Sequence, residues 1–484
     1  MMLSRLLLVV GLVAVLPVHA QDCSALNPCA TGCCSKSGYS GFCGLGPDYC
    51  SPESCVSGCE NKAYCDPGGY GDYAEHSKCP LNVCCSKYGY CGITEEFCGN
   101  KKVKRPSAEF NGYTPLNKIV GYYEGWSRNR KCHTFFPEQI PLGIYTHLNY
   151  AFATIDPETF EVKLASSTEA DLVRRLARLK TQDPDLKVFI AIGGWAYNNP
   201  GPTRTTFSDL AASHDAQKRF FKSLISFLST YNLDGVDIDW EYPGPDDIVE
   251  RGGREEDFKN FPVFLQRLKQ ALKSAGGRDG LTITLPASYW FLQYFDIVKL
   301  EKYVDFFNMM TYDLHGAWDR GNKWVGPYLN AHTNLTEIQD AMDLLWRNKI
   351  PSKKVILGTG FYGRAFTATS ESCMEPGCTY ESAANKGPCS NENGILLNSE
   401  IVDIINEKGL KPKLYKEAGV KVVHWDNQWV AYDDEETLEL KAQFALGQAL
   451  GGVMVWAVSH DTTDRRFTNA FYTRTRFCGS PEDY

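Results

Sequence analysis

Apolar segments recur along the chain from Lys118 onward, and amphipathic segments separate several of them. Eight apolar segments are predicted to be strands: 119–123, 146–153, 187–193, 235–241, 281–287, 304–312, 354–360 and 452–457. Helical periodicity marks four of the intervals, at 169–180, 215–230, 258–275 and 335–348. Strands that alternate with helices are typical of a parallel α/β architecture. Eight such units predict a (β/α)8 TIM barrel whose site lies at the C-terminal ends of the strands.

The interval between the seventh and eighth predicted strands is too long for a single helix. It runs from Phe366 to about Asp434 and contains several short strand-like runs, among them 420–425. We therefore expect an inserted α+β subdomain over about 367–434, inside a catalytic domain that covers 117–475. Such an insertion would form one wall of a substrate cleft.

The first hundred residues have a different composition. Met1 to Ala20 combine one arginine, an apolar run and a small-residue cleavage site, which is typical of a secretory signal peptide. Fourteen of the 19 cysteines lie between Cys23 and Cys98. In an oxidising compartment this density predicts a disulfide scaffold, and adjacent cysteine pairs with few histidines disfavour zinc. Because no later segment is apolar enough to span a bilayer, we expect a soluble, secreted protein.

The charge of the chain restricts its partners. The net charge is −8 and the isoelectric point is near 5.7, which argues against a nucleic-acid partner. A neutral polymer is compatible with this balance. The one basic cluster, Lys101 to Arg105, is short and is interpreted as part of a solvated linker over 101–116. We expect neither nucleic acid nor a membrane as partner.

The most informative stretch is the acidic run from Asp234 to Glu241. On a strand, Asp237, Asp239 and Glu241 project to one face and apolar side chains to the other. Three carboxyl groups this close are costly to bury fully ionised, so we expect them to share protons and the last to stay protonated near neutral pH. A carboxyl group with a raised pKa is suited to general acid catalysis. A calcium loop and a solvated acidic run are the alternatives, and the interleaved Val, Ile and Trp disfavour both.

The same stretch carries a resemblance to a known family. Asp234, Asp237, Asp239 and Glu241 match the D-x-x-D-x-D-x-E signature of family 18 glycoside hydrolases, the chitinases, and the match extends from about residue 118 to 464. The resemblance implies substrate-assisted hydrolysis with retention, in which the 2-acetamido oxygen of the sugar attacks the anomeric carbon. Glu241 would be the general acid and then the base. Asp239 would hold the acetamido group and exchange a proton with Asp237, while Asp234 falls on the opposite face, where a purely structural role is open to it.

The resemblance implies further substrate contacts. Tyr312 would donate to the acetamido oxygen, Asp313 would bind sugar hydroxyls and Trp456 would form the floor under the −1 sugar. The remaining matches are Tyr122, Trp126, Trp195, Met310, Trp318, Tyr362 and Arg364. Core packing is the alternative for a lone aromatic residue, and a structural carboxylate is the alternative partner of Arg364. Ala191 stands where the family commonly has a serine beside the innermost aspartate, so we expect Asp237 to depend on other partners, such as Tyr122.

Two copies of a small cysteine-rich unit are predicted at 21–60 and 61–100. The second resembles the hevein-type chitin-binding module, in which Ser86, Tyr88, Tyr90 and Phe97 would form the sugar platform. The first departs from the pattern. Ser37 stands in place of Tyr88, Tyr39 or Phe42 could supply a ring, and Tyr49 matches Phe97, so we expect weak binding or a spacer role. The resemblance implies the pairs Cys65–Cys85, Cys79–Cys91 and Cys84–Cys98, and for the first copy Cys23–Cys34, Cys29–Cys43, Cys33–Cys50 and a terminal Cys55–Cys59.

The sequence therefore predicts a secreted, retaining chitinase, with a layout similar to fungal chitinases that also resemble the chitin-binding subunit of yeast killer toxins. Its expected partners are chitin and N-acetylglucosamine oligosaccharides, and we expect a monomer with no metal and no organic cofactor. The alternatives are a chitin lectin, a toxin-delivery subunit with a partner chain, and an endo-β-N-acetylglucosaminidase. Endo or exo action stays open, as does the pairing of Cys132, Cys373, Cys378, Cys389 and Cys478.

Overall fold

The computed structural model describes residues 22–36, 41–111 and 114–475 of the 484-residue chain. The chain divides into two compact units, Met1–Lys102 and Val103–Tyr484, which are described separately as the module unit and the catalytic unit. The predicted signal peptide, Ser37, Tyr39 and Cys478 lie outside the described residues. Within the described residues, none of the helices has the length and apolar character needed to cross a bilayer.

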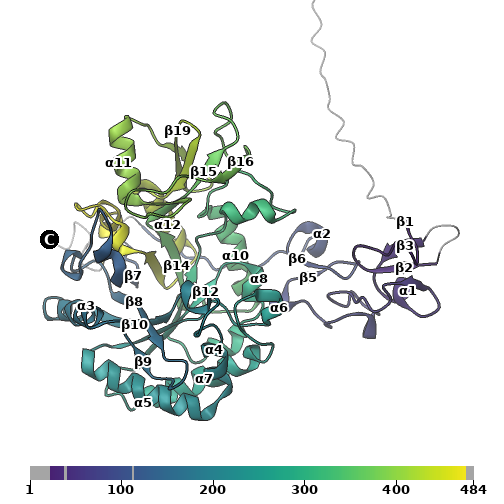
Figure 1. Cartoon of the computed structure of the whole chain (residues 1–484), viewed down its shortest axis with the longest axis horizontal. Coiled ribbons are helices and arrows are strands. Elements are labelled where there is room, and N and C mark those ends of the chain that lie inside the picture. Colours follow the sequence, from purple (N-terminus) through teal and green to yellow (C-terminus); the bar gives the residue numbers. More distant parts are fainter. Residues whose placement is uncertain (1–21, 37–40, 112–113, 476–484) are drawn as a thin grey trace, which may run out of the picture. The chain divides into compact units, whose positions relative to one another are not determined.

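The catalytic unit is built on a closed parallel barrel (Figure 1). All eight predicted strands are present: β7 (Ile119–Glu124), β8 (His147–Ile155), β10 (Lys187–Gly193), β11 (Gly235–Asp239), β12 (Gly280–Pro286), β13 (Phe306–Met310), β14 (Val355–Gly360) and β21 (Gly452–Trp456). They follow the order β10-β11-β12-β13-β14-β21-β7-β8, and the pairing of β10 with β8 closes the ring. A short strand, β9 (Val162–Lys163), pairs antiparallel with β8.

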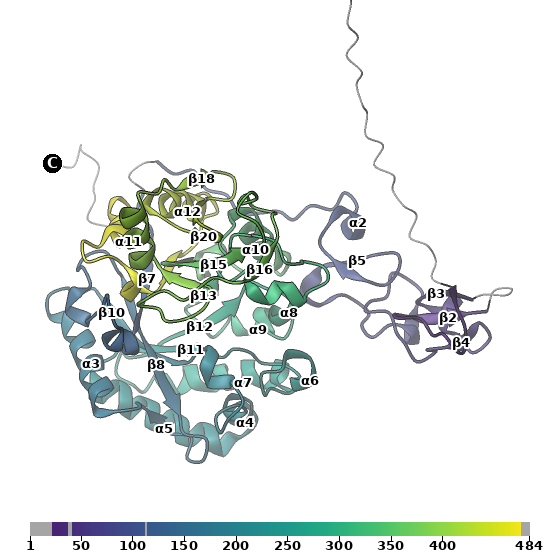
Figure 2. The same cartoon turned by 45° about the horizontal axis from the view of Figure 1, so that its top comes forward.

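Amphipathic helices cover the outside of the barrel, as the periodicity predicts. They are α3 (Ser167–Arg178), α5 (His214–Tyr231), α7 (Asp257–Leu272) and α10 (Leu335–Arg347), and Figure 2 shows α3, α5 and α7 along the outside of the strands. A further helix that the periodicity did not predict, α12 (Glu435–Gly447), follows the insertion. In α5, Phe220, Leu224 and Leu228 recur every four residues and are buried, so one face packs inward. Ser213 caps its first turn by accepting from the Ala216 N–H at 3.2 Å.

The inserted subdomain is an antiparallel sheet with one helix. Its strands are β15 (Tyr362–Ala368), β16 (Tyr380–Ala383), β17 (Ile395–Leu397), β18 (Lys413–Tyr415), β19 (Val420–Trp425) and β20 (Gln428–Tyr432), and its helix is α11 (Asn398–Lys408). The sheet begins at Tyr362, earlier than the expected boundary at 367, because only Phe361 separates β14 from β15. Trp429 and Phe366 lie in the core on one side of the sheet, and Val430 and Ile401 in the core on the other.

Two disulfides pair four of the five cysteines whose partners the sequence left open. Cys373–Cys378 closes a short loop inside the insertion, and Cys132–Cys389 ties the insertion to the segment that follows β7. The long bridge spans a sequence separation of 257 residues, so it restrains the insertion against the barrel.

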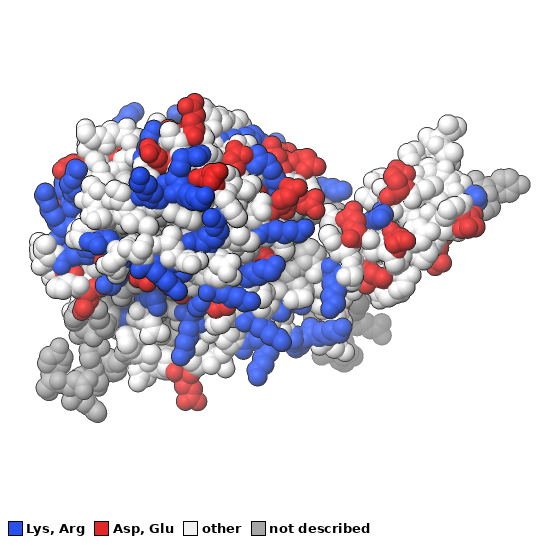
Figure 3. Space-filling model, turned by 90° about the horizontal axis from the view of Figure 1, so that it is seen from below, with Lys and Arg blue, Asp and Glu red and all other residues white. Residues whose placement is uncertain are grey.

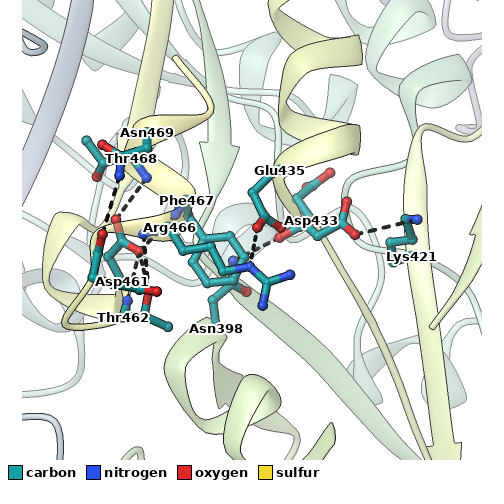
Figure 4. Close-up of polar contacts among 12 residues, drawn as sticks. Asn398, Lys421, Asp433, Glu435, Asp461, Thr462, Arg466, Phe467, Thr468 and Asn469 are labelled. Atoms are coloured by element: carbon teal, nitrogen blue, oxygen red, sulfur yellow. Dashed lines mark hydrogen bonds and ion pairs between the residues drawn. The ribbon is translucent and has the colours of Figure 1, made fainter. Parts of the chain in front are cut away.

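Polar contacts also hold the insertion where the chain returns to the barrel (Figure 4). The Asn398 side chain donates to the Asp433 carbonyl at 2.9 Å, and Arg466 pairs with Glu435. The Asp461 carboxylate accepts from the Thr468 backbone N–H at 2.8 Å, close to the start of α13 (Arg466–Asn469). These contacts join α11, α12 and the segment after β21.

The basic cluster is exposed, as expected of a solvated linker, but its arginine is anchored to the catalytic unit. Arg105 donates from Nε to Asp343 Oδ1 at 2.8 Å and from Nη2 to Asp343 Oδ2 at 2.9 Å, which anchors it on α10. The Leu116 N–H donates to the Arg474 carbonyl at 2.9 Å. Arg105 is therefore attached to the catalytic unit by a bidentate pair with Asp343. The sequence alone does not show that the two residues are neighbours.

The module unit has little regular structure and is held by disulfides. Its strands are β1 (Asp22–Cys23), β2 (Cys33–Ser35), β3 (Gly41–Gly44) and β4 (Cys55–Ser57) in one small sheet, and β5 (Cys84–Cys85) with β6 (Cys91–Gly92) in a second. The cysteines are paired as the family resemblance implies: Cys23–Cys34, Cys29–Cys43, Cys33–Cys50, Cys55–Cys59, Cys65–Cys85, Cys79–Cys91 and Cys84–Cys98. A unit this small has almost no apolar core and needs such covalent links.

Candidate active site

The acidic stretch begins with Asp234, continues through β11 and ends with the two residues that follow it, at the C-terminal ends of the barrel strands. Asp237, Asp239 and Glu241 are all buried, and the apolar side chains between them face the helical layer. Trp240, for example, stacks on Phe207 of α4 (Thr206–Ala212) with a centroid distance of 5.4 Å. Asp234 lies apart, where it pairs with Lys180 at 2.9 Å and accepts from the Val188 N–H at 2.8 Å. Its role in the described structure is to join strands and helix.

Asp237 is the innermost carboxyl group and has three hydrogen-bond donors. The Tyr122 hydroxyl donates to Oδ2 at 2.6 Å, while Thr282 Oγ1 at 2.6 Å and Asn308 Nδ2 at 3.0 Å donate to Oδ1. Ala191 stands opposite Asp237 in the register of β10 and β11 and offers no donor. Burial raises the pKa of Asp237, and the three donors oppose this rise. Tyr122 is thus a partner of Asp237, as the missing serine led us to expect.

Asp239 lies between the other two acids. Thr284 Oγ1 donates to its Oδ1 at 2.6 Å. Burial raises its pKa well above the usual value, and the charges of Glu241 and Asp237 raise it further. The crowding argument therefore gives the right direction, although burial is the largest cause.

Glu241 has the pKa that a general acid needs. Burial is the main cause that raises its pKa to about 7, while a hydrogen bond from Tyr242, the charge of Arg251 and the Trp195 backbone N–H oppose the rise. A carboxyl group with this pKa holds its proton in part of the molecules near neutral pH and can also release it. It meets the electrostatic requirement for proton donation to a leaving group.

Arg251 supports both Glu241 and an exposed ring. Its Nε donates to the Glu241 carbonyl at 2.9 Å and its Nη1 to Asn199 Oδ1 at 2.9 Å, and its Nη2 contacts the Trp195 carbonyl. The guanidinium lies 3.8 Å from the centroid of the Trp195 ring, within the range of a cation–π contact. The Trp195 ring is half-exposed, so it is accessible to a ligand as well as to Arg251.

The segment after β13 contributes a second carboxylate. Asp313 has a left-handed backbone with φ of 56° and accepts from the Tyr362 hydroxyl at 2.6 Å and from Arg364 Nε at 2.8 Å and Nη2 at 2.6 Å. Its backbone N–H donates to His332 Nδ1 at 3.3 Å. Burial acts to raise the pKa of Asp313, but Arg364 and His332 outweigh it and hold this pKa well below the usual range. Asp313 is therefore a fixed negative charge.

Tyr312 and the aromatic side chains complete this end of the barrel. The Tyr312 hydroxyl lies 3.9 Å from the Met454 sulfur, a weak acceptor, so its proton remains available to a ligand. Trp456 packs on Tyr122 at 5.5 Å and on Phe152 at 5.7 Å between centroids, and Trp126 stacks on Phe152 at 6.1 Å.

The other predicted substrate contacts differ in exposure. Trp126, Trp195 and Trp318 are 45%, 53% and 51% exposed, whereas Met310 and Tyr362 are buried. The Arg364 guanidinium lies 4.8 Å from the Trp318 ring centroid.

Sequence reasoning missed the residues that support these groups: Thr282, Thr284, Asn308, Arg251, His332 and Phe152. A signal existed for Thr282 and Asn308, since polar side chains in buried parallel strands need a partner. Thr282 stands opposite Asp237 in the strand register, and Asn308 lies on the next strand. Arg251 and His332 lie in loops, where no periodicity marks the direction of a side chain.

The predicted sugar platform of the second module has its rings on the surface. Tyr88 and Tyr90 are exposed, and Phe97 packs against Gly92. Ser86 is buried, and its Oγ accepts from the backbone N–H groups of Tyr88 at 3.3 Å and Tyr90 at 3.2 Å. Ser86 thus orders the turn that presents the two tyrosines.

Comparison with known proteins agrees with this site. Residues 118–461 match the family Glycosyl hydrolases family 18, and residues 70–105 match Chitin recognition protein. The chain is 31% identical over 430 residues to a probable chitinase, LysM18, of Penicillium expansum, covering 82% of this chain and 29% of the relative. It is 33% identical over 359 residues to the killer toxin subunits alpha/beta of Kluyveromyces lactis, covering 71% of this chain and 30% of the relative. The chain thus spans less than a third of the length of these fungal relatives.

A solved structure shows the same fold. Human YKL-39, described as a pseudo-chitinase with retained chitooligosaccharide binding, aligns with a TM-score of 0.65 and 27% identity, covering 74% of this chain and 99% of that one. The family match spans most of the catalytic unit, including every acid of the motif and the Asp313 segment. The chain is a member of glycoside hydrolase family 18 and also carries a chitin-recognition module.

Proposed function

We propose that the protein is a chitinase that hydrolyses β-1,4-linked N-acetylglucosamine polymers with retention of configuration. The observation that carries this proposal is Glu241: a buried carboxyl group with a pKa of about 7 at the C-terminal end of a barrel strand, next to Asp239. A binding site has no need of a carboxyl group held at such a pKa, because burying it costs stability.

The proposed mechanism uses a single protein acid and a group of the substrate itself. Protonated Glu241 donates its proton to the glycosidic oxygen while the acetamido oxygen attacks the anomeric carbon, which breaks the glycosidic bond and forms an oxazolinium ion. Asp239 accepts the acetamido N–H and balances the positive charge of the ring. Glu241, now ionised, takes a proton from the water that opens the oxazolinium ion, and this step restores the acid and retains the configuration.

Other groups position the substrate. Tyr312 donates to the acetamido oxygen and so orients it for attack, an effect of preorganisation. Asp313, ionised through Arg364, accepts from sugar hydroxyls, and Trp456 forms the floor under the reacting sugar. Trp126, Trp195 and Trp318, each about half exposed, stack on further sugars of the chain. Asp237 exchanges a proton with Asp239 and is kept in place by its three donors.

The module unit indicates where the protein acts. Its disulfides are stable in an oxidising compartment, and a relative of this chain is named a secreted chitinase, so we propose that the protein acts outside the cell. The modules tether the catalytic unit to insoluble chitin and raise the local substrate concentration.

Release of soluble oligosaccharides from insoluble chitin tests the proposal, with wild type compared with Glu241→Gln. Glutamine keeps the shape of the side chain but has no proton of useful acidity. We expect wild type to release products and the variant to lose activity by several orders of magnitude while it still binds chitin. Proton NMR of the first product would show the β-anomer if configuration is retained.

The alternatives make different predictions in the same assay. A chitin lectin or delivery subunit would bind chitin without releasing products, as the pseudo-chitinase relationship allows. An endo-β-N-acetylglucosaminidase would release N-glycans from a glycoprotein and leave chitin intact. Either result would contradict the proposed function.

A further inference from the structure

The first module keeps the geometry of the second although its sequence departs from it. In the second module the Phe97 ring covers Gly92, which follows Cys91, and in the first the Tyr49 ring covers Gly44, which follows Cys43. A Cβ atom at Gly44 would lie 2.5 Å from the Tyr49 ring, and one at Gly92 would lie 2.6 Å from the Phe97 ring. The two aromatic residues therefore occupy equivalent places.

A second aromatic residue of the first module, Phe42, also has a counterpart in the second module. Phe42 stands opposite Ser35 in the β2–β3 register, and the Ser86 N–H donates to the Tyr90 carbonyl at 2.8 Å in the second module. Phe42 thus takes the place of Tyr90, and both rings are on the surface, at 40% and 41% exposure. Exposed rings on a disulfide-stapled unit have no core to fill, which points to a ligand.

Tyr70 of the second module lies at the junction between the two modules. The Tyr70 ring is wedged between Gly46 of the first module and Gly89 of the second, where added Cβ atoms would lie 2.5 Å and 3.2 Å from it. Gly46 has φ of 86°, a conformation that favours glycine. The Asp66 carboxylate holds the loop by accepting from the N–H groups of Gly68, Tyr70 and Gly71 at 2.7, 2.9 and 3.1 Å.

Further contacts cross the same junction. Tyr73 packs against the cystine core of the first module, formed by Cys33, Cys50 and Cys55. The Asn61 side chain donates to the Gly32 carbonyl at 2.9 Å. The two modules are therefore packed together as one body, in agreement with their membership of a single compact unit.

The wedge lies close to the rings of both modules. The Tyr70 hydroxyl donates to the carbonyl of Lys87, the residue before Tyr88, at 3.5 Å. On the other side the ring lies against Gly46, whose carbonyl accepts from the Tyr49 N–H at 3.1 Å. Tyr70 itself is half-buried, so part of its ring faces solvent. Figure 3 shows the module unit from one side as a mainly uncharged surface with a few acidic and basic groups. Such a surface suits a neutral polymer better than a charged one.

We propose that the two modules form one composite binding surface for a single chain of β-1,4-linked N-acetylglucosamine, with Tyr70 joining the rings of the first module to those of the second. The occupant follows from continuity with the second module, which matches the chitin-recognition family. The proposal rests on chitin binding as part of the proposed function, and it gives the first module a direct role. A polymer that reaches both ring sets gains from the second contact without a further loss of translational freedom.

Binding isotherms on insoluble chitin test the proposal, measured by depletion of full-length protein that carries Glu241→Gln so that the polymer stays intact. The test variants are Phe42→Ala in the first module and Tyr88→Ala in the second. Leu26→Ala is the matched control, because Leu26 is an apolar residue of the first module with 98% exposure. Non-reduced peptide mapping verifies that every variant keeps its disulfides.

We expect Phe42→Ala and Tyr88→Ala each to weaken binding about fivefold, the loss of one stacked ring, and Leu26→Ala to leave it unchanged. Tyr70→Ala should weaken binding at least as much, because the ring sets lose their fixed spacing. Tyr70→Phe should bind like the parent, since it keeps the wedge and loses only the hydroxyl. If Phe42→Ala weakens binding but Tyr70→Ala does not, the two modules bind chitin at separate sites and the composite surface is wrong.

The failure of each idea has its own signature. If Tyr88→Ala weakens binding and Phe42→Ala behaves like Leu26→Ala, the first module does not touch chitin and the composite surface is wrong. If neither variant matters, chitin binding by the modules is wrong. Hydrolysis of a soluble oligosaccharide by wild type and by Leu26→Ala, both with Glu241 in place, tests catalysis separately, and its absence in both proteins would contradict only the proposed catalytic function.

Discussion

The raised pKa of Glu241 predicts that this buried carboxyl group lowers the stability of the fold at high pH. The folded state keeps a proton on Glu241 up to about pH 7, whereas the unfolded chain releases it near the usual value of 4.5. Between these values the folded state binds more protons than the unfolded one, so the free energy of unfolding falls as the pH rises. The rise of the pKa from 4.5 to about 7 corresponds to about 3 kcal/mol, at 1.36 kcal/mol per pKa unit.

Glu241→Gln removes this titration and should therefore be stabilising in a pH-dependent way. Compared with wild type, the variant should gain about 3 kcal/mol in the free energy of unfolding between about pH 4 and about pH 8. Asp239 adds to the gain with the same sign, because the charge of Glu241 contributes to raising its pKa. Any effect of the amide on packing is the same at both pH values and cancels in the comparison.

Urea denaturation followed by tryptophan fluorescence measures the effect. All ten tryptophans lie between Trp126 and Trp456, so the signal reports the unfolding of the catalytic unit alone. Glu407→Gln on α11 is a matched control, since it makes the same substitution at an exposed acid outside the motif, and its stability is compared with that of wild type at the same two pH values. An equal stability difference between Glu241→Gln and wild type at both pH values would refute the reasoning, because Glu241 would then ionise without cost.

Three further predictions concern catalysis and the insertion. The value of kcat/KM on a chitooligosaccharide should fall above about pH 7, by about tenfold per pH unit, because only protonated Glu241 donates; a flat profile up to about pH 9 would contradict this assignment. Thr282→Val removes a buried donor to the innermost aspartate, so kcat should fall by about tenfold with little change in KM; an unchanged kcat would show that this hydrogen bond is dispensable. Replacing both cysteines of Cys132–Cys389 by serine should lower the free energy of unfolding by about 2–5 kcal/mol in urea titrations, more than the same change at the short Cys373–Cys378 bridge; equal losses would argue against a loop-length effect.

The sequence could predict the barrel because its strands and helices have different periods of apolar residues. Each of the eight predicted strands is present in the structure, with ends that differ by a few residues. The acid motif could be predicted in part for the same reason, since alternation along β11 places Asp237 and Asp239 on one face, whereas Glu241 lies just beyond the end of the strand. The cysteine pairs of the modules followed from a family resemblance and not from geometry.

The supporting contacts of the site, the start of the insertion and the pKa of Glu241 depended on the tertiary structure, which brings residues from different elements together. Arg251 reaches the Glu241 carbonyl from one loop, and His332 accepts from the Asp313 N–H from another, so no local pattern reveals either contact. The insertion begins at Tyr362 because β15 pairs with β20 and β17, which lie later in the chain. The pKa of Glu241 is likewise a tertiary property. The sequence placed the acids side by side, but only the folded barrel removes water from them, and burial is the largest cause of the rise in the pKa of Glu241 to about 7.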